Sequence, residues 1–589
     1  MGVVNGVSSS DLSLPSKIEM KSKVVVIGLD GGSFDLLKPW IDQGELPFLK
    51  KMMGEGISGE LESVIPPVTA PAWNSFITGK NPGKHGIYDF FYRDEDFKPH
   101  PINSYTRKDK AIWEIIGDEG GVSLVLNLPT TYPPRELKGA LITDFLTPSG
   151  KDDFTYPQYL VKEIEEKFGN YPLFFKTPSL AVNLTDSLTD TFLQECMHAL
   201  TYKFEVARFL QEKFDPHFVI LHIWESDPIC HALWHVIDRG HPLFEERVFQ
   251  RHGEKILTYF RRFDQETQRL WEKMGGEETP LFIISDHGFG RLRKMIDLNV
   301  WLLKEGYLVL KKRVSTRLSH FLWAQGFTHE ALYRRLYVPL VKRGYRYKSD
   351  ESLITNFTKF FSRRFALLTI HDVDWSRTRV FCNVGVAGSG QIVINVKGKF
   401  PCGVVSSGKE YEELRTELVS KLKRLRDPET DQEIKGDIFT RDEAYTGEYT
   451  AMAPDITFLP MNNEYLAMSI FGFTSNQVMS RPLGMSAHHK RKGILFGKGV
   501  PLRSGVWVEG ARILDLFPTI LYIMGIKIPQ DIDGRVLQEI ILPAFLETNP
   551  IQFREAPSAS KSVAHTSTAE EEKDYLKKLQ RLGYIDWEE

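Results

Sequence analysis

The sequence repeats one local pattern, in which a short apolar run ends in acidic or polar residues and a helical stretch follows. The first run is Val24–Leu29, and Asp30, Gly31 and Gly32 come directly after it. Runs of the same kind occur at Val122–Leu126, Leu141–Thr143, Phe218–His222, Leu281–Ile284 and Ile494–Phe496. Apolar, β-branched runs of this length are typical of strands buried on both faces. Strands that alternate with helices predict an α/β sheet covered by helices on both faces.

Helical patterns accompany these runs. Ser33 can cap the helix that follows the first run. Apolar positions three or four residues apart predict a longer helix with one core-facing stripe, made of Ile256, Phe260, Phe263, Thr267, Leu270 and Met274. Two further helices are predicted at Ile513–Met524 and Lys573–Leu582.

The length of 589 residues favours two domains, or one domain with a large insertion, because single cores stop growing at about 250–300 residues. Between 301 and 484 the strand and helix rhythm weakens, and Lys, Arg and aromatic residues become frequent. We therefore predict a main α/β domain from 21–300 and 485–545, with 301–484 as an inserted cap that contains basic, aromatic-rich helices. Residues 1–20 are expected to form a disordered tail, and 546–589 a flexible linker with a short C-terminal helix.

Charge and cysteine content exclude several classes of protein. The net charge of −3 and a pI near 6.6 provide no overall field for nucleic acid, so no nucleic-acid partner is expected. The four cysteines are far apart and form no C-x-x-C pair, which argues against a disulfide framework and a cysteine zinc site. No apolar stretch resembles a secretion signal or reaches the ~18–20 residues that span a bilayer. These features favour a cytoplasmic protein.

The residues that follow the apolar runs have the side chains that bind metals. Asp30 follows the first run, Asp227 lies just after the fourth, and Asp286-His287-Gly288 follows the fifth. In open α/β sheets, ligands bind at the carboxyl ends of the strands, so we expect these side chains to converge. Asp227 and His231 are four residues apart and would share one face of a helix, where they could bind one metal. His235 is an alternative ligand, because it forms an HxxxH pair with His231.

Two other segments contain polar groups that could belong to the same site. Thr69 lies between Pro67 and Pro71, which hold its hydroxyl at a junction between a loop and a helix. It can be a simple helix N-cap, or it can act at the helix N-terminus, which is a good anion site. Late in the chain, His488-His489 precedes the last apolar run. Each of these features is weak alone, and their order along the chain is more informative.

This ordered set resembles the alkaline phosphatase superfamily, specifically the type I phosphodiesterase/nucleotide pyrophosphatase family. The family's nucleophile region is similar to residues 69–88, TAPAWNSFITGKNPGKHGIY. Its closing segment is similar to Asp515–Gly525, which Asp533-Gly534-Arg535 follows. The resemblance implies an alkaline-phosphatase-like three-layer αβα sandwich with a large inserted cap region.

The resemblance also implies two divalent metal ions and assigns their ligands. One ion would be held by Asp30, Thr69, Asp286 and His287, and the other by Asp227, His231 and His489. His488 is the alternative for the last position. His489 is preferred because the family's histidine stands four residues before the glycine that opens the next strand, here Gly493. A ligand set of Asp and His favours Zn²⁺, with Mn²⁺ as the alternative.

The function implied is a two-metal phosphohydrolase, namely a phosphodiesterase/nucleotide pyrophosphatase that acts on a small-molecule phosphate ester through a phosphothreonine intermediate on Thr69. A threonine hydroxyl is a poor nucleophile at neutral pH unless a metal or a base activates it. The family's nucleotide pyrophosphatases have Asn three residues after the nucleophile, contacting a phosphoryl oxygen. Here that position is Ala72, with Asn74 nearby. The alternatives are therefore a phosphomonoesterase or phosphotransferase/phosphomutase of the same superfamily, and a catalytically silent binding protein with this fold.

The cap contains one strongly basic stretch. Residues 311–348 include ten Lys or Arg and a single acid, Glu330, with aromatic residues such as Phe321, Trp323 and Phe327 between them. One interpretation is a solvated helical face that packs on the core. The other is a basic amphipathic surface that meets an anionic substrate or an anionic membrane.

Overall fold

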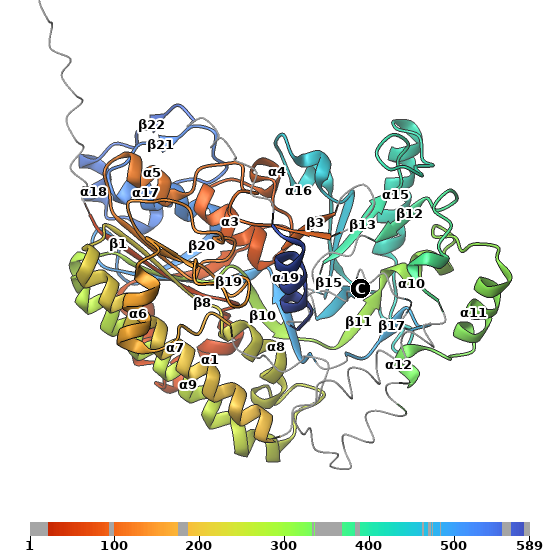
Figure 1. The fold of residues 1–589 in the computed structure, drawn as a ribbon, viewed down its shortest axis with the longest axis horizontal. Coiled ribbons are helices and arrows are strands. Elements are labelled where there is room, and N and C mark those ends of the chain that lie inside the picture. Colours follow the sequence, from red (N-terminus) through yellow and green to blue (C-terminus); the bar gives the residue numbers. More distant parts are fainter. Residues whose placement is uncertain are drawn as a thin grey trace, which may run out of the picture.

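The structure is a computed structural model. It describes residues 22–93, 99–174, 186–332, 335, 368–382, 389–461, 464–468, 473, 475–482, 485–556 and 567–581. The tail expected at 1–20 lies outside these residues, as does most of the basic stretch beyond 332. Figure 1 shows a large body built on one sheet, with a smaller lobe beside it.

The large body contains a nine-stranded sheet with the strand order β20-β2-β19-β9-β1-β8-β5-β6-β7. The strands are β1 (Val24–Leu29), β2 (Ile57–Glu62), β5 (Ser123–Leu126), β6 (Gly139–Ile142), β7 (Thr155–Tyr156), β8 (Phe218–Ile223), β9 (Leu281–Ile284), β19 (Lys492–Lys498) and β20 (Val506–Arg512). Strand β1 is parallel to both of its neighbours, β8 and β9. Strand β19 is antiparallel to both β2 and β9, so the sheet is mixed. The five strands from β9 to β6 are parallel, and their carboxyl ends therefore meet at one edge.

Each face of this sheet has its own core. Val25, Ile27 and Leu29 of β1 face one core, and Val24 and Val26 face the other. The first core is covered by α1 (Phe34–Gln43), α2 (Pro47–Glu55), α6 (Leu160–Phe168), α7 (Asp186–Phe214) and α9 (Glu246–Lys273). The second is covered by α3 (Thr69–Thr78), α5 (Ile112–Asp118) and α17 (Leu516–Ile523), on the opposite side of the sheet in Figure 1. The predicted three-layer α/β fold is confirmed.

Local patterns predicted several helices correctly. Ser33 is the N-cap of α1, and its hydroxyl oxygen accepts a hydrogen bond from the N–H of Asp35 at 3.2 Å. The predicted stripe on α9 is buried along its whole length. The helix predicted at Ile513–Met524 begins as a 3₁₀ turn, Ile513–Asp515, before α17.

The smaller lobe is formed by the chain that leaves the large body after β10 (Gly288–Arg291) and returns at β18 (Ala487–Lys490). These two strands pair with each other in antiparallel fashion. The residues between them have a separate core, formed around a four-stranded sheet of order β12-β13-β15-β14. Its elements are α10 (Leu298–Lys304), α11 (Val314–Ala324), β12 (Val380–Cys382), β13 (Gly390–Ile394), α15 (Lys409–Lys423), β14 (Gly436–Thr440) and β15 (Ile456–Pro460). A small sheet of β11 (Lys294–Asp297), β16 (Tyr465–Met468) and β17 (Met479–Ser480) lies between this core and the large body.

The C-terminal segment differs in part from the expected flexible linker. Helix α18 (Pro543–Thr548) and strand β22 (Phe553–Arg554) occupy its first part, and β22 pairs with β21 (Ile528–Pro529). Leu546 and Ile551 pack against the second core of the sheet, which holds this first part in place. Residues 557–566 lie outside the described part of the chain. Within the described residues, no helix has the length and apolarity needed to cross a membrane.

The last described helix, α19 (Ala569–Arg581), docks on the large body. Tyr575, Leu576 and Leu579 join its core, and the Tyr575 hydroxyl donates to the carbonyl of Phe90 at 2.8 Å. We expect Leu579→Ala to lower the free energy of unfolding by about 2–4 kcal/mol, because it leaves a cavity in a closed core. Denaturant unfolding would measure this, with the exposed Lys577→Ala as control. Equal midpoints for the two variants would contradict the docking of α19.

Candidate metal centre

The predicted ligands gather where the parallel strands end. Asp30 follows β1, and Asp286 and His287 follow β9. Asp227 lies in the first turn of α8 (Ser226–Ile237), which begins after β8. All seven predicted site residues are at most 3% exposed. Because β1 lies between β8 and β9, the three strand ends bring these residues together from distant parts of the chain.

Thr69 is the first residue of α3, and Val68 is the N-cap. The interpretation of Thr69 as the helix N-cap is therefore wrong. Its hydroxyl oxygen lies 3.3 Å from Nε2 of His287. The N–H groups of Thr69 and Ala70 make no hydrogen bond within the described residues, so the positive end of α3 is free to meet an anion.

One group of ligand atoms is formed by Asp30, Asp286 and His287. Nε2 of His287 is 3.5 Å from Oδ1 of Asp30 and 3.3 Å from Oδ2 of Asp286. The backbone N–H of Gly31 donates to the other Asp286 oxygen at 3.2 Å. Oδ1 of Asp30 and Oδ2 of Asp286 are buried and accept no hydrogen bond within the described residues. A buried carboxylate oxygen without a donor is costly, and a bound cation would remove that cost.

The second predicted set is Asp227, His231 and His489. The ligand atoms that lie within reach of one ion there are those of Asp227, His287 and His489, and Nε2 of His231 adjoins them, 3.0 Å from Nε2 of His489. Nε2 of His489 is 3.1 Å from Oδ1 of Asp227, and Nε2 of His231 is 3.5 Å from the same oxygen. The rings of His287 and His489 stack with their centroids 3.6 Å apart, so the two groups adjoin. His287 is also close enough to share a ligand position with Asp227 and His489.

The imidazoles of His231, His287 and His489 all point Nε2 into the site. Nδ1 of His231 lies 3.0 Å from the carbonyl of Ala487, and Nδ1 of His489 lies 3.2 Å from the carbonyl of Pro67. Nδ1 of His287 lies 3.2 Å from the Gly288 carbonyl. A carbonyl only accepts, so each Nδ1 carries the hydrogen and each Nε2 presents a lone pair. Two of these Nε2 atoms, of His231 and His489, are 3.0 Å apart, which is unfavourable unless a cation lies near both. Nδ1–H bonded to a carbonyl with Nε2 free is the usual arrangement of metal-binding histidines.

The charges in the site agree with this arrangement. Burial, together with the nearby Asp286 and Asp227, raises the pKa of Asp30 well above its usual range. Burial raises the pKa of Asp286 to about 6. For Asp227, burial alone would raise the pKa, but His231 and His489 outweigh it and lower the pKa. Burial lowers the pKa values of His231 and His287 to about 4, so these imidazoles are neutral at pH 7. Crowded carboxylates beside neutral imidazoles form a strong cation site.

Other buried groups support the ligands from behind. Nε2 of His222, on β8, is 3.1 Å from the second oxygen of Asp30, as a supporting strand residue would be. Nζ of Lys203, on α7, lies 2.6 Å from Oε1 of Glu225, and both side chains are at most 1% exposed. Glu225 occupies the N-cap position of α8, the helix that carries Asp227, so this buried ion pair lies directly behind that ligand. The sequence analysis missed the pair of Lys203 and Glu225, because a single lysine in a helix has no distinguishing pattern.

Several alternatives lie outside both ligand groups. His488 accepts a hydrogen bond at Nδ1 from the N–H of His489 and belongs to neither group; His489 is the one that contacts Asp227. The ring of His235 faces His241, with centroids 6.1 Å apart. Nδ2 of Asn74 donates to the Ala70 carbonyl at 2.8 Å and to Thr130 at 2.9 Å, so this amide is already engaged.

The glycine- and lysine-rich stretch after α3 has a structural role. Lys80 is paired with Asp109 at 2.5 Å and with Asp531, and Lys84 is paired with Asp533 at 2.5 Å. Nε2 of His85 lies 2.9 Å from the hydroxyl of Ser75 on α3. These contacts tie α3 to the segment after α17 and thereby hold Thr69 in place.

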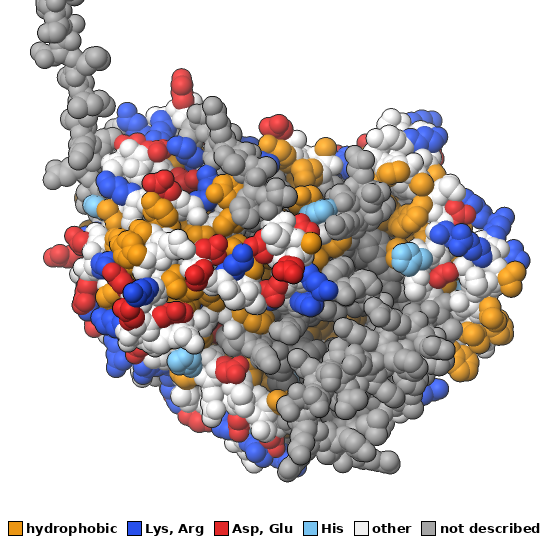
Figure 2. Space-filling view, in the orientation of Figure 1, with side chains coloured by type: hydrophobic (Ala, Val, Ile, Leu, Met, Phe, Trp, Pro, Cys, Tyr) orange, Lys and Arg blue, Asp and Glu red, His pale blue; other side chains and the backbone are white. Residues whose placement is uncertain are grey.

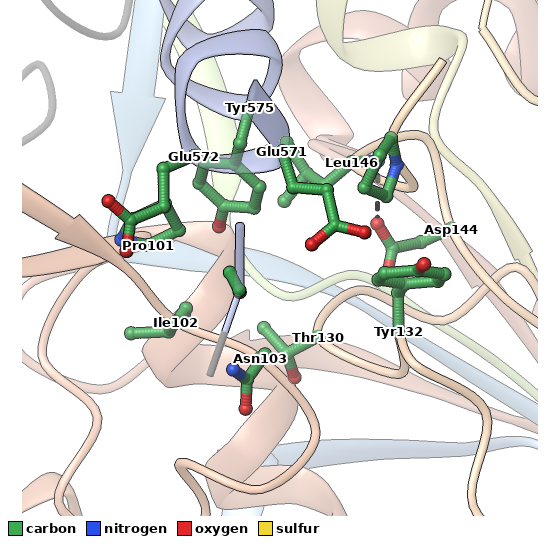
Figure 3. Close-up of a pocket in the computed structure, with 12 residues that line it drawn as sticks. Pro101, Ile102, Asn103, Thr130, Tyr132, Asp144, Leu146, Glu571, Glu572 and Tyr575 are labelled. Carbon is green, nitrogen blue, oxygen red and sulfur yellow. Dashed lines mark hydrogen bonds between the residues drawn. The ribbon is translucent and has the colours of Figure 1, made fainter. Parts of the chain in front are cut away.

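A pocket lies further along the same edge of the sheet, between α19 and the loops that follow β5 and β6 (Figure 3). Figure 3 shows Tyr575, Glu571 and Glu572 on one side and Asn103 and Thr130 on the other. Glu571 is paired with Lys151 at 2.7 Å. None of the seven predicted site residues lines this pocket, so it is separate from the Asp and His groups.

Comparison with known proteins gives one family match. A family model described as type I phosphodiesterase / nucleotide pyrophosphatase matches residues 24–469. This range contains every predicted site residue except His489. Comparison with curated proteins gives no match.

Two solved structures show the level of structural similarity. Murine ectonucleotide pyrophosphatase / phosphodiesterase 5 is 12% identical with a TM-score of 0.45, over 88% of this chain and 100% of that chain. Phosphonoacetate hydrolase from Sinorhizobium meliloti 1021, in complex with phosphonoformate, is 15% identical with a TM-score of 0.47, over 85% and 94% of the two chains.

Proposed function

Because the chain belongs to the type I phosphodiesterase / nucleotide pyrophosphatase family, we propose that it is a two-metal phosphodiesterase with Thr69 as its nucleophile. Family membership makes it a hydrolase that acts on phosphate esters. The observation that carries the finer proposal is that two ligand groups share His287, whose Nε2 lies 3.3 Å from the hydroxyl of Thr69. An intact ligand set of this kind argues against a catalytically silent binding protein.

In this proposal each ligand group holds one divalent ion. Asp30, Thr69, Asp286 and His287 would hold one, and Asp227, His231 and His489 the other. Such ions, when bound, stabilise negative charge on phosphoryl oxygens and lower the pKa of a bound hydroxyl. The inward Nε2 atoms and the carboxylate oxygens without donors support a cation here. A donor set of nitrogen and oxygen favours Zn²⁺, with Mn²⁺ as the alternative.

The protein's own groups would bind the ester, supply the nucleophile and exclude water. The N–H groups of Thr69 and Ala70, at the start of α3, bind a phosphoryl oxygen and orient the ester. Oγ of Thr69 gives its proton to water and attacks phosphorus, as the bond from phosphorus to the leaving oxygen breaks and that oxygen takes up a proton from water. Water later cleaves the phosphothreonine, releases the phosphoryl group and restores the hydroxyl. The burial of Thr69 keeps other water away from this intermediate.

One observation favours a second candidate, a phosphomonoesterase or phosphotransferase of the same superfamily. Ala72 is fully buried and has no polar side-chain atom where the nucleotide pyrophosphatases have an asparagine. Asn74 does not replace it, since its amide binds Ala70 and Thr130. The contact to a phosphoryl oxygen must come from the start of α3 instead, and this contact suits a monoester as well as a diester.

We also propose a cytoplasmic setting and a small-molecule substrate. Within the described residues none of the four cysteines forms a disulfide, and Cys402 is exposed, which suits a reducing compartment. Thiol titration of the protein from cells, denatured without reductant, should find four free thiols; fewer would argue for an oxidising compartment.

The proposed function is tested by adding Zn²⁺ or Mn²⁺ to metal-free protein and measuring hydrolysis of bis(4-nitrophenyl) phosphate and 4-nitrophenyl phosphate. We expect metal-dependent hydrolysis with a higher kcat/KM for the diester. A higher kcat/KM for the monoester would favour the second candidate. Hydrolysis that persists without metal would refute the two-metal proposal. Absence of both hydrolysis and bound metal would favour the silent protein.

A further inference from the structure

Helix α11 has an apolar stripe that faces solvent. Val314, Leu318 and Phe321 are spaced by four and three residues and so lie on one side of the helix. They are 83%, 59% and 60% exposed, and Phe327, just beyond the helix, is 57% exposed. Large apolar side chains are often exposed singly, but three along one side of a helix form a contiguous patch, and such patches mark interaction sites.

The opposite side of α11 is anchored, so this exposure is a fixed property of the fold. Trp323 is 3% exposed, and its indole N–H donates to the carbonyl of Phe473 at 3.0 Å. The hydroxyl of Thr316 donates to Asp372 at 2.7 Å. These contacts set the rotation of the helix and leave the apolar stripe outside.

Basic side chains surround the stripe. Lys312, Arg313 and Arg317 are exposed, and no acidic side chain of the described residues pairs with them. Lys311 adds a fourth positive charge and donates to the carbonyl of His371 at 2.7 Å. The sequence from 306 to 329 contains no Asp or Glu. Figure 2 shows a group of Lys and Arg side chains at the outer edge of the smaller lobe, with hydrophobic side chains beside it.

We propose that this basic apolar surface, made of Lys311, Lys312, Arg313, Val314, Arg317, Leu318, Phe321 and Phe327, docks the protein onto an anionic lipid bilayer. Short amphipathic helices with basic and aromatic residues insert their apolar face at the level of the headgroups. The positive charges are attracted to anionic lipid over about one Debye length.

Other occupants fit less well. A second copy of the chain would bring the same positive charges face to face, which is unfavourable. Single-stranded nucleic acid would stack its bases on aromatic rings; Phe321 and Phe327 could serve, but the aliphatic side chains of Val314 and Leu318 would stay exposed to water. The bilayer satisfies both the charge and the aliphatic character of the stripe.

Vesicle sedimentation of the full chain tests the proposal. The probes are phosphatidylcholine vesicles and phosphatidylcholine vesicles that contain phosphatidylglycerol. We expect binding only with the anionic lipid, and loss of binding at about 1 M salt because the Debye length falls to about 3 Å. Phe321→Glu should lower the vesicle partition coefficient at least about tenfold, since it puts a charge at the inserting position. The double variant Arg313→Gln, Arg317→Gln should also lower the partition coefficient for anionic vesicles, by a smaller factor than Phe321→Glu does.

The matched control is Phe553→Glu, which changes an equally exposed phenylalanine, 56% exposed, on the large body. It should bind vesicles as the unchanged protein does. The proposal would be overturned if Phe321→Glu and Phe553→Glu lost vesicle binding to the same extent. It would also be overturned if the protein bound neutral and anionic vesicles equally. A dimer that forms with rising protein concentration and is abolished by Phe321→Glu would also overturn it, as would tight binding of the protein to a DNA oligomer. Unfolding midpoints of the variants show whether any loss reflects misfolding, and the readout does not depend on hydrolysis.

Discussion

Thr69→Ala should abolish phosphodiester hydrolysis and leave folding almost unchanged, with three of the four proposed ligands of the first ion still in place. The variant removes the one hydroxyl that lies at the start of α3 and within 3.3 Å of His287. We expect kcat to fall by a factor on the order of 10³ or more, as when other covalent nucleophiles are removed. Thr69→Ser keeps the hydroxyl and should retain measurable activity. Steady-state kinetics on the aryl diester would measure both.

Ser75→Ala is the matched control for this experiment. Ser75 is a fully buried hydroxyl on the same helix, and it contacts His85 at 2.9 Å instead of the ligand groups. Its loss should reduce stability by about 1 kcal/mol, the value of one hydrogen bond, with little change in kcat. If Thr69→Ala hydrolysed the diester as fast as Ser75→Ala, Thr69 would not be the nucleophile.

Asp286→Asn should remove one metal ion and most of the activity. Asp286 is fully buried, and one of its oxygens has no hydrogen-bond donor within the described residues, so its negative charge is available to a cation. An amide in its place gives a neutral, weaker ligand. We expect a larger drop in metal affinity than the roughly 10–100-fold that follows loss of an outer hydrogen-bond partner. Elemental analysis after dialysis should give one bound ion per chain instead of two.

Asp264→Asn controls for the removal of a buried carboxylate. Asp264 is 1% exposed and accepts hydrogen bonds from the N–H groups of Phe48 and Leu49 at 2.9 and 2.8 Å, in a different part of the core. This variant should unfold at a lower denaturant concentration yet keep two ions. Two ions bound to Asp286→Asn as tightly as to Asp264→Asn would rule out Asp286 as a ligand.

The strand ends were the predictable part of the site. Asp30, Asp227 and Asp286 could be placed together because parallel strands bring their carboxyl ends to one edge, a rule that needs no knowledge of side-chain packing. Thr69 was different, since a hydroxyl between prolines at a helix start is usually a cap. Only its position in the ordered set suggested another role, and the structure shows that Val68 occupies the cap.

Packing between distant segments was not predictable. Lys203 lies in the middle of α7 and resembles any surface lysine, yet it is buried against Glu225. The residues at 546–556 have a composition typical of linkers, but β22 pairs with β21, more than twenty residues earlier in the chain. Such contacts depend on the three-dimensional neighbours and have no local pattern. For α11 the sequence left two interpretations open, a helical face packed on the core and a basic amphipathic surface. The choice between them depends on how the helix is anchored through Trp323 and Thr316, which the sequence does not reveal.

The spread of the site residues along the chain has a consequence for biosynthesis. The seven residues lie between positions 30 and 489, and His489 is the last of them to leave the ribosome. At about 5–20 residues per second, roughly 20–90 s separate the synthesis of Asp30 from that of His489. A nascent chain therefore spends this time without a complete second ligand group. On the proposed function, the first ligand group is complete at His287, but the second ion and the onset of activity must await nearly the whole chain, so unfinished chains released early would be inert in the cell.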